Sequence, residues 1–420
     1  MARKTTLLCL LALAGFGAKA APVIAVRAGQ LFDPKSGALF PNQIVLIAGE
    51  RITDVGPADR VQIPPGAQVI DLSRATVLPG LIDQHVHVME AGLRNPPLPI
   101  HDMPVNQAGL DAYIDRVLLA VVDAQKDLNA GFTTINDMGS HGGSWGTVAL
   151  RDAIDKGLLR GPRMLVAGPT LSEMNPKLDS AEAARAAVRE LADHHVNWVK
   201  ITSSGAFTFR ADGTLDIKPG NPGTLEITRA IVEEAHKHGL KVACHAYGGE
   251  GLRNCIDAGA DAPQHGLDLD DQSLRMLLQK NIPLNATLFD LRLFDKEEME
   301  KYANSRFRMM EKSFKKALAA GVRLGFSSGA QADNTGFPHG SQGETFAYLV
   351  KWGLAPAQAL RTATTVNAEI IGWQDRVGTV EKGKFADLIA VAGDPLKDIT
   401  EMQRVKFVMK GGDVVRNDFK

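Results

Sequence analysis

The segment TLEITRAIVEEAHKHGLKVACHAYG, residues 224–248, contains one complete unit of the fold that we predict for this chain. Its first part is predicted to be a helix, because it ends at Gly239, and glycine commonly caps a helix C-terminus. The apolar run KVACHA then predicts a short strand, and His245 ends it. A helix, a glycine and a strand that ends in a polar residue are therefore the unit to expect elsewhere in the sequence.

The same alternation of helices and short apolar strands is predicted from residue 109 to residue 328. Its strands include FTTIND, residues 132–137, and NWVKIT, residues 197–202. With the strand before His85, eight strands alternate with helices. This count predicts an α/β fold, a (β/α)8 TIM barrel, which needs about 250 residues or more. We assign the barrel to residues 81–376.

Both ends of the chain differ from this middle part. Residues 22–80 contain short apolar runs separated by Gly and Pro, which are typical of antiparallel strands and turns. Residues 377–420 return to that pattern. We therefore predict one small β-sandwich domain that both chain ends form together.

Residues 1–21 are predicted to be a secretory signal peptide. Arg3 and Lys4 precede the apolar stretch 7–16, and residues 18–20, AKA, form an A-x-A cleavage pattern. The apolar stretch is shorter than the roughly 20 residues that a membrane span needs. We therefore expect an exported protein, periplasmic or secreted, with no membrane span after the signal peptide is cleaved.

The composition is that of an ordinary globular protein. Of the 420 residues, 45% are apolar and 23% are charged, and the formal net charge is -1. A chain with so little net charge has no global field to attract nucleic acid or an anionic membrane. We therefore expect a small-molecule partner and no nucleic acid, and we leave a homo-oligomer open.

Two cysteines, Cys244 and Cys255, follow the predicted signal peptide. An oxidising compartment would permit a disulfide between them. Their expected positions, in a buried strand and in the next helix, favour two buried free thiols instead. Two cysteines are also too few for a structural zinc site.

Five candidate metal ligands fall at predicted strand ends. His85 and His87, in LIDQHVHV, are two residues apart, so in a strand both side chains would point to the same face. Lys200 lies in the fourth predicted strand, His245 ends the fifth and His265 ends the sixth. The carboxyl ends of barrel strands meet at one rim, where active sites lie. This convergence favours a metal site over scattered surface histidines.

Lys200 is flanked by apolar residues in its predicted strand. Burial in a barrel disfavours the charged form of a lysine. The commoner outcome is an ion pair with a nearby carboxylate. The alternative is a carbamate made with carbon dioxide, which would turn the cation into an anion with two oxygens that could bridge two metal ions.

These residues, with the long segments CHAYGGEGLRNCIDAGADAPQHG (244–266) and TATTVNAEIIGWQDRVGTVEKGKFADLIAVAGDP (362–395), resemble the amidohydrolase superfamily. Within it the chain is similar to the binuclear carboxypeptidase and prolidase-like branch, which includes ochratoxin-degrading enzymes. The resemblance implies two divalent ions, with zinc expected, and a metal-bridging hydroxide that hydrolyses an amide. It also implies dipeptides, N-acyl amino acids or ochratoxin A as substrates. His85 and His87 would bind one ion, His245 and His265 the other, and carbamylated Lys200 would bridge them.

The chain departs from the superfamily at the end of the eighth strand. The superfamily places there an aspartate that binds metal and carries protons, but the strand count puts Gly329 at that position. Counting back from the following PHG gives Asp333, about 13 Å further along an extended strand. Asp333 is therefore our candidate metal ligand and catalytic acid–base. The alternative is that Asp333 is a solvated loop residue.

Three further residues are candidates for substrate contact. Tyr247 follows His245 by two residues, His141 lies just past the second strand, and His339 lies in the loop after the eighth. Each histidine could equally be an ordinary loop residue. Two other functions stay open: a cyclic amide or lactone hydrolase with the same metals, and a non-catalytic exported binding protein on a decayed scaffold, which Gly329 would favour.

Overall fold

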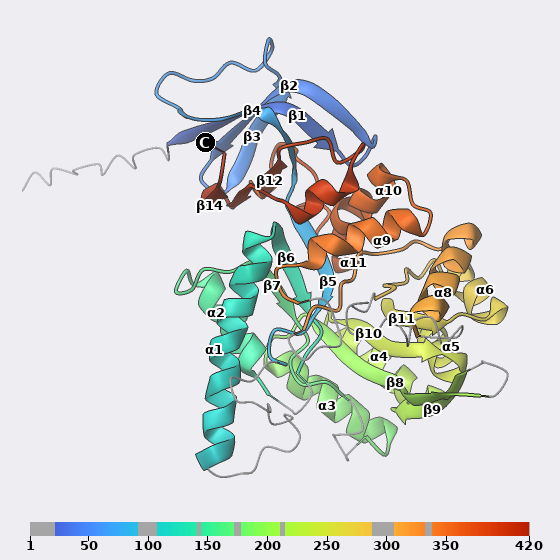
Figure 1. Ribbon diagram of the computed structural model, residues 1–420. Helices are drawn as coiled ribbons and strands as arrows, with labels where there is room; N and C mark the ends of the chain where they lie inside the picture. Colours follow the sequence, from blue (N-terminus) through green and yellow to red (C-terminus); the bar gives the residue numbers. More distant parts are fainter. Residues whose placement is uncertain are drawn as a thin grey trace, which may run out of the picture.

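Two regions make up the part of the chain that the structure describes: a seven-stranded sheet and a mixed α/β region (Figure 1). No helix in this part is both long and apolar enough to cross a membrane. Asp333, His141 and the predicted signal peptide lie outside the described residues. The computed structural model describes residues 22–90, 107–140, 144–171, 178–210, 215–287, 306–331 and 338–419.

Strands from both chain ends form one sheet, as the sequence predicts, in the order β14-β13-β12-β4-β1-β2-β3. β1 is antiparallel to β2 and parallel to β4, and β12 pairs with β4 to join the two ends. Side chains such as Val45, Leu388 and Phe407 are fully buried in its core. A sandwich needs two packed layers and stays a prediction. The strands are β1 (Val23–Asp33), β2 (Ala38–Ala48), β3 (Arg51–Pro57), β4 (Gln68–Pro79), β12 (Leu388–Val391), β13 (Phe407–Lys410) and β14 (Asp413–Asn417).

Parallel strands alternate with helices between these ends. β5, β6 and β7 form one sheet, and β11, β10 and β8 form a second, to which β9 adds antiparallel to β8. The sequence did not predict β9, because β8 was expected to end near residue 202. The strands are β5 (Leu81–Val86), β6 (Phe132–Asp137), β7 (Arg163–Val166), β8 (Trp198–Phe209), β9 (Leu215–Asn221), β10 (Lys241–Gly248) and β11 (Ala262–Asp268).

Helices precede or follow these strands as the sequence predicts. Ser180 and Thr224 start α3 and α4, since each hydroxyl accepts a hydrogen bond from a backbone N–H three residues on, at 3.2 and 3.3 Å. Gly239 lies just past α4 with a φ of 71°, a left-handed conformation that glycine adopts without strain. The helices are α1 (Gln107–Asn129), α2 (Gly146–Asp155), α3 (Ala181–Asp193), α4 (Leu225–Lys237), α5 (Gly249–Ala258), α6 (Asp271–Gln279), α8 (Arg306–Ala320), α9 (Thr345–Lys351), α10 (Pro356–Arg361) and α11 (Asn367–Ile371).

Isolated parallel bridges connect the two parallel sheets and the segments between them. One bridge joins the segment after β7 to β8, and another joins β11 to the segment around residue 285. A third bridge joins the segment around residue 285 to residue 324. A fourth joins residue 330 to β5. The neighbours therefore follow the order that a (β/α)8 barrel requires.

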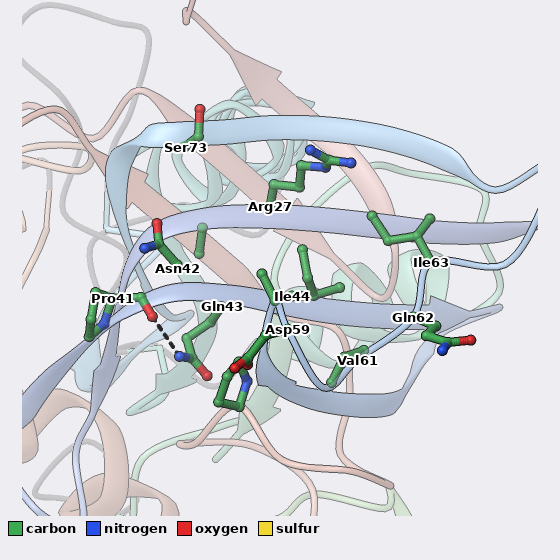
Figure 2. A pocket seen from close by; sticks show the side chains of 13 residues that line it. Arg27, Pro41, Asn42, Gln43, Ile44, Asp59, Val61, Gln62, Ile63 and Ser73 are labelled. Atoms are coloured by element: carbon green, nitrogen blue, oxygen red, sulfur yellow. Dashed lines mark hydrogen bonds between the residues drawn. The ribbon is translucent and has the colours of Figure 1, made fainter.

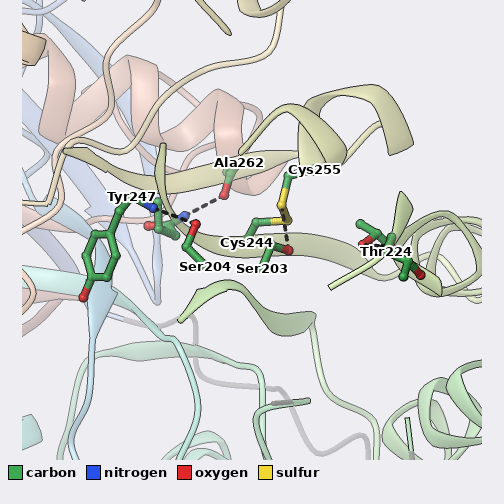
Figure 3. The surroundings of a disulfide bond; sticks show 9 residues. Ser203, Ser204, Thr224, Cys244, Tyr247, Cys255 and Ala262 are labelled. Carbon is green, nitrogen blue, oxygen red and sulfur yellow. Dashed lines mark hydrogen bonds between the residues drawn. A yellow bond between two sulfur atoms is a disulfide. The ribbon is translucent and has the colours of Figure 1, made fainter. Parts of the chain in front are cut away.

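The two cysteines are joined, so the prediction of free thiols is wrong. Cys244 in β10 and Cys255 in α5 form a disulfide across a Cα–Cα distance of 6.3 Å (Figure 3). Both are fully buried, and the Ser203 hydroxyl of β8 lies 3.0 Å from Cys255 Sγ. The sequence positions were predicted correctly, but a buried strand residue can face the helix that covers it, and this contact brings the two sulfurs together.

Candidate functional site

Four histidines and Lys200 come together from β5, the residue just past it, β8, β10 and β11. The ring centroids of His85 and His87 are 5.0 Å apart, and those of His245 and His265 are 4.3 Å apart. His85 and His265 connect the two pairs at 5.1 Å. The structure therefore places all five predicted residues of this group in one cluster.

The first histidine pair has its tautomers fixed by neighbouring acceptors. His85 Nδ1 lies 2.9 Å from Gln264 Oε1, and the amide of Gln264 itself donates to Ala262 O. His87 Nδ1 lies 2.8 Å from Gly139 O. Both Nδ1 atoms must therefore donate, which leaves an acceptor lone pair on each Nε2. The two Nε2 atoms face each other at 3.0 Å, an arrangement that favours a cation between or beside them.

The second pair is equally close. His245 Nδ1 lies 2.9 Å from His265 Nε2. His265 has a φ of 74°, a left-handed conformation that is uncommon for residues other than glycine, and such residues cluster at functional sites. The pairing of β10 with β11 shifts just after His265, so β11 is irregular where this side chain meets His245.

Lys200 lies beside the first pair, with its Nζ atom 3.5 Å from His85 Nε2 and only 2% of the residue exposed. Burial lowers the pKa of Lys200 to about 7, although the charge of Asp137 opposes this. Burial, and then the charges of Lys200 and His87, hold the pKa of His85 well below its usual value. Much of Lys200 is therefore a neutral amine near neutral pH, the form that can add carbon dioxide.

Two buried carboxylates support this cluster, and sequence reasoning did not single them out. Asp83 accepts hydrogen bonds from the backbone N–H groups of His85 and Ser328, at 3.1 and 3.2 Å. Burial raises its pKa to about 7. Asp137 accepts from the N–H groups of Val88 and Gly139 at 3.0 and 3.1 Å, and burial raises its pKa to about 6.

A sequence signal existed for both carboxylates. Asp83 lies two residues before His85, and Asp137 ends the predicted strand FTTIND. A carboxylate at the end of a buried strand is as good a functional candidate as a histidine there, because burying an unpaired carboxylate is costly.

The segment predicted to be the eighth strand forms only isolated bridges, and Gly329 in it offers no side chain to the site. Its φ is 64°, its N–H donates to His85 O at 2.9 Å, and the next residue, Ala330, accepts from His87 N at 2.8 Å. These contacts hold the strand end against β5. Asp333, the predicted ligand and proton carrier, lies outside the described residues, so its role stays a prediction.

The predicted substrate residues have different surroundings. The Tyr247 ring lies 4.5 Å from that of His245 and 5.5 Å from that of His265, so it borders the second pair. His339 is buried and paired with Asp127, whose charge and hydrogen bond raise its pKa to about 9 against the effect of burial. This location favours a structural role for His339 over substrate contact. His141 lies outside the described residues.

The cluster offers its nitrogen donors in two close pairs. Among the described residues, no three His, Cys, Asp or Glu side chains already surround a single point. Instead, each histidine pair offers two nitrogen donors, and divalent ions such as zinc need further ligands from lysine carbamate, carboxylate or water. A metal ion at either pair would therefore need ligands from outside that pair.

A cavity of about 950 Å³ opens elsewhere, on the seven-stranded sheet, and none of the clustered histidines lines it (Figure 2). Its walls include Arg27, Asn42 and Asp59. A smaller cavity of about 460 Å³ lies closer to the cluster, since it is lined by Ser204, which accepts a hydrogen bond from Tyr247 N. The chemistry of the histidine cluster identifies the site better than cavity size does.

Known proteins resemble this chain over most of its length. The sequence profile of the amidohydrolase family matches residues 76–415. Ochratoxinase of Aspergillus niger is 25% identical over 329 residues, a match that covers 69% of this chain and 66% of ochratoxinase, so the chain spans about two thirds of its length.

Solved structures agree with the sequence comparison. A Xaa-Pro dipeptidase with methionine bound in its active site is similar with a TM-score of 0.79 and 27% identity, over 94% of this chain and 100% of that chain. The structure of Aspergillus niger ochratoxinase shares the fold with a TM-score of 0.75 and 22% identity, over 96% and 97%. The predicted resemblance to amidohydrolases, and to their ochratoxinase and prolidase-like members, is confirmed.

Proposed function

The chain belongs to the amidohydrolase family, and from this premise we propose that it is a binuclear metal-dependent hydrolase of amide bonds. Its expected substrates are dipeptides and N-acyl amino acids, with ochratoxin A as a further candidate. This substrate class is suggested by the names of its relatives, an ochratoxinase and a Xaa-Pro dipeptidase. We also propose that the eight strand segments close a (β/α)8 barrel, and that the protein is exported.

One observation supports the metal site most strongly. His85 and His87 direct their Nε2 lone pairs at each other across 3.0 Å, while both Nδ1 atoms donate to oxygen acceptors. Two unprotonated nitrogens at this distance repel unless a cation balances them. His245 Nδ1 and His265 Nε2 also lie close together, 2.9 Å apart.

The side chains of the cluster have distinct roles in this proposal. His85 and His87 would hold one ion, His245 and His265 the other. The neutral amine of Lys200 would add carbon dioxide and release a proton, and the resulting carbamate would lie between the two pairs. When bound, the ions would polarise the substrate carbonyl and activate water. Tyr247 would border the substrate beside the second pair.

Proton transfer to the leaving nitrogen needs a further group. A positioned carboxylate is a common choice for such a transfer, and we propose Asp333 for this role. Gly329 occupies the expected position at the strand end and has no side chain to offer.

The test combines elemental analysis with a substrate panel. We expect two divalent ions per chain, with zinc the expected metal, and turnover of N-acyl amino acids and dipeptides but not of cyclic amides or lactones. A folded, fully reconstituted protein that holds no tightly bound metal would contradict the proposal.

Gly329 also supports a second candidate, a binding protein on a decayed enzyme scaffold. Such a protein would bind N-acyl amino acids in a calorimeter but would hydrolyse none of them. Measurable turnover that chelation abolishes and zinc restores would exclude this candidate.

A further inference from the structure

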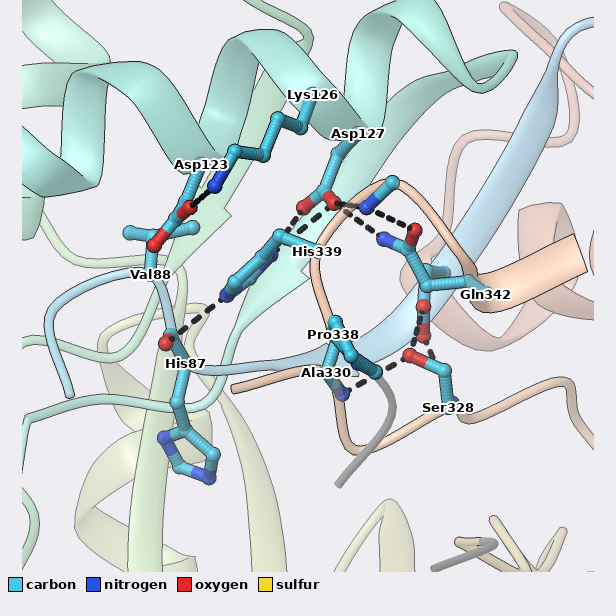
Figure 4. Close-up of polar contacts among 12 residues, drawn as sticks. His87, Val88, Asp123, Lys126, Asp127, Ser328, Ala330, Pro338, His339 and Gln342 are labelled. Carbon is cyan, nitrogen blue, oxygen red and sulfur yellow. Dashed lines mark hydrogen bonds and ion pairs between the residues drawn. The ribbon is translucent and has the colours of Figure 1, made fainter. Parts of the chain in front are cut away.

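His339 makes contacts that its loop position did not suggest. Its Nδ1 atom lies 2.9 and 3.0 Å from the two carboxylate oxygens of Asp127, and its Nε2 atom lies 3.3 Å from His87 O (Figure 4). Only 1% of the His339 side chain and 0% of the Asp127 side chain are exposed. Both ring nitrogens face oxygen acceptors, so both must carry protons, and the ring is a buried cation.

Asp127 occupies an unusual position for a carboxylate. It lies in the last turn of α1, where the helix dipole disfavours a negative charge. Besides His339, it accepts from Gly340 N at 3.2 Å and from the Gln342 side-chain amide. Gln342 in turn accepts from Gly340 N at 2.8 Å. The carboxylate therefore organises the segment that carries His339.

His87 is held from three directions. Its N–H donates to Ala330 O at 2.8 Å, its Nδ1–H donates to Gly139 O at 2.8 Å, and its carbonyl faces His339. The carbonyl lies one residue past the end of β5. The peptide after His87 lies past the end of β5, where His339 holds its carbonyl and Asp137 accepts a hydrogen bond from its N–H.

We infer that the Asp127–His339 pair positions His87 for metal binding, an inference that rests on the proposed metal site. His339 is then a positioning residue rather than a substrate contact. A buried ion pair that served only to stabilise the fold would not need a contact with a ligand residue. The effect of the Asp127–His339 pair on metal affinity distinguishes a positioning role from one that only stabilises the fold.

The test measures metal affinity rather than activity alone. We would titrate metal-free protein with Co2+ against a competing chelator and record the cobalt absorption spectrum, with circular dichroism to verify folding. Changes to groups that orient metal ligands typically weaken affinity by about 10- to 100-fold. We expect a loss of that size for one of the two ions in His339→Gln and Asp127→Asn, and a smaller loss in Asp127→Glu.

His236→Gln is the control. His236, in α4, also pairs with a carboxylate, Asp261, at 2.9 Å, but its side chain is 44% exposed and the pair contacts none of the proposed metal ligands. The control should bind cobalt with the parent affinity and spectrum. If His339→Gln does not fold, Gln342→Ala removes only one partner of Asp127 and should still weaken binding of one ion.

The possible failures are distinguishable. Folded His339→Gln and Asp127→Asn variants with parent affinity and spectrum would overturn this inference while leaving the metal site intact. An equal loss in His236→Gln would also overturn it, because the effect would then be one of general stability. A parent protein that binds no cobalt would overturn both the proposed function and this inference.

Discussion

Lys200 is the single residue on which the proposed chemistry most depends. Its Nζ atom lies 3.5 Å from His85 Nε2, and no other described side chain of the cluster could become a bridging anion. Lys200→Ala should abolish amide hydrolysis and lower the metal affinity by more than the about 10- to 100-fold expected for loss of an orienting contact, so that less metal is retained. Activity assays and elemental analysis of the variant would measure both effects.

Chemical rescue sharpens this test. Added bicarbonate should not restore the Lys200→Ala variant, because no amine remains to form a carbamate. Short carboxylic acids could fill the gap and restore part of the activity. Near-normal turnover of the variant would show that Lys200 has only a structural role.

The proton carrier is tested by changing two positions. Asp333→Asn should lower the catalytic rate by about 10²- to 10⁴-fold if Asp333 transfers protons, while metal content falls less than in a His85 variant. If Asp333 is solvated instead, Asp333→Asn should match a slow parent, and Gly329→Asp should raise its activity. The φ of 64° at Gly329 would cost this variant about 1–2 kcal/mol.

One outcome contradicts the assignment at both positions. A fast parent with an unaffected Asp333→Asn variant would mean that neither residue supplies the proton. Rates on a single N-acyl amino acid, with metal content measured on the same samples, distinguish these cases.

Residues that stand out within their own apolar run could be predicted from the sequence to cluster. This applies to the five candidate ligands, each of which interrupts or ends such a run: His85, His87, Lys200, His245 and His265. Asp127 and His339 gain their importance only from contact between α1 and a segment more than two hundred residues away. No local pattern encodes such a contact.

At the scale of elements, the disulfide joins the strand of one proposed ligand to the helix that covers it. Cys244 precedes His245, and Cys255 lies in α5, 11 residues further on. Closing a loop of this length stabilises a fold by about 2–3 kcal/mol. The free energy of unfolding of the double variant Cys244→Ala/Cys255→Ala should therefore be lower by about that amount, and the variant should unfold at a lower urea concentration.

Reducing conditions provide the control for this variant. A reductant should lower the unfolding midpoint of the parent toward that of the double variant and leave the variant itself unchanged. Equal midpoints for the oxidised parent and the variant would show that the bond adds no stability.

Element order was more predictable than element pairing. Helices and strands of the middle part follow from apolar runs, N-caps and glycines such as Gly239, all of which are local. β9 was missed because the second half of β8 pairs with β9, and no local sequence pattern predicts that pairing. The disulfide was missed for the same reason, since helix–strand packing decides which side chains meet.

At the scale of the whole molecule, the site connects parts of the chain that are distant in sequence. β4 from the N-terminal end continues into β5, which carries His85, while β12 from the C-terminal end pairs with β4. The shared sheet therefore anchors the first strand of the site from both chain ends. A ligand that binds the cluster should stabilise the entire fold and not the cluster alone.

Metal removal tests this coupling. A ligand that binds only the folded state stabilises it by about 4 kcal/mol when its free concentration is 1,000 times Kd. A chelator should therefore lower the Tm of the parent by several degrees, and added zinc should restore it. In a variant with His85→Asn and His245→Asn, one change in each histidine pair, the Tm should not respond to chelator or zinc. A parent whose Tm is the same with and without chelator would contradict the proposed metal site, because an ion that binds only the folded state must raise its Tm.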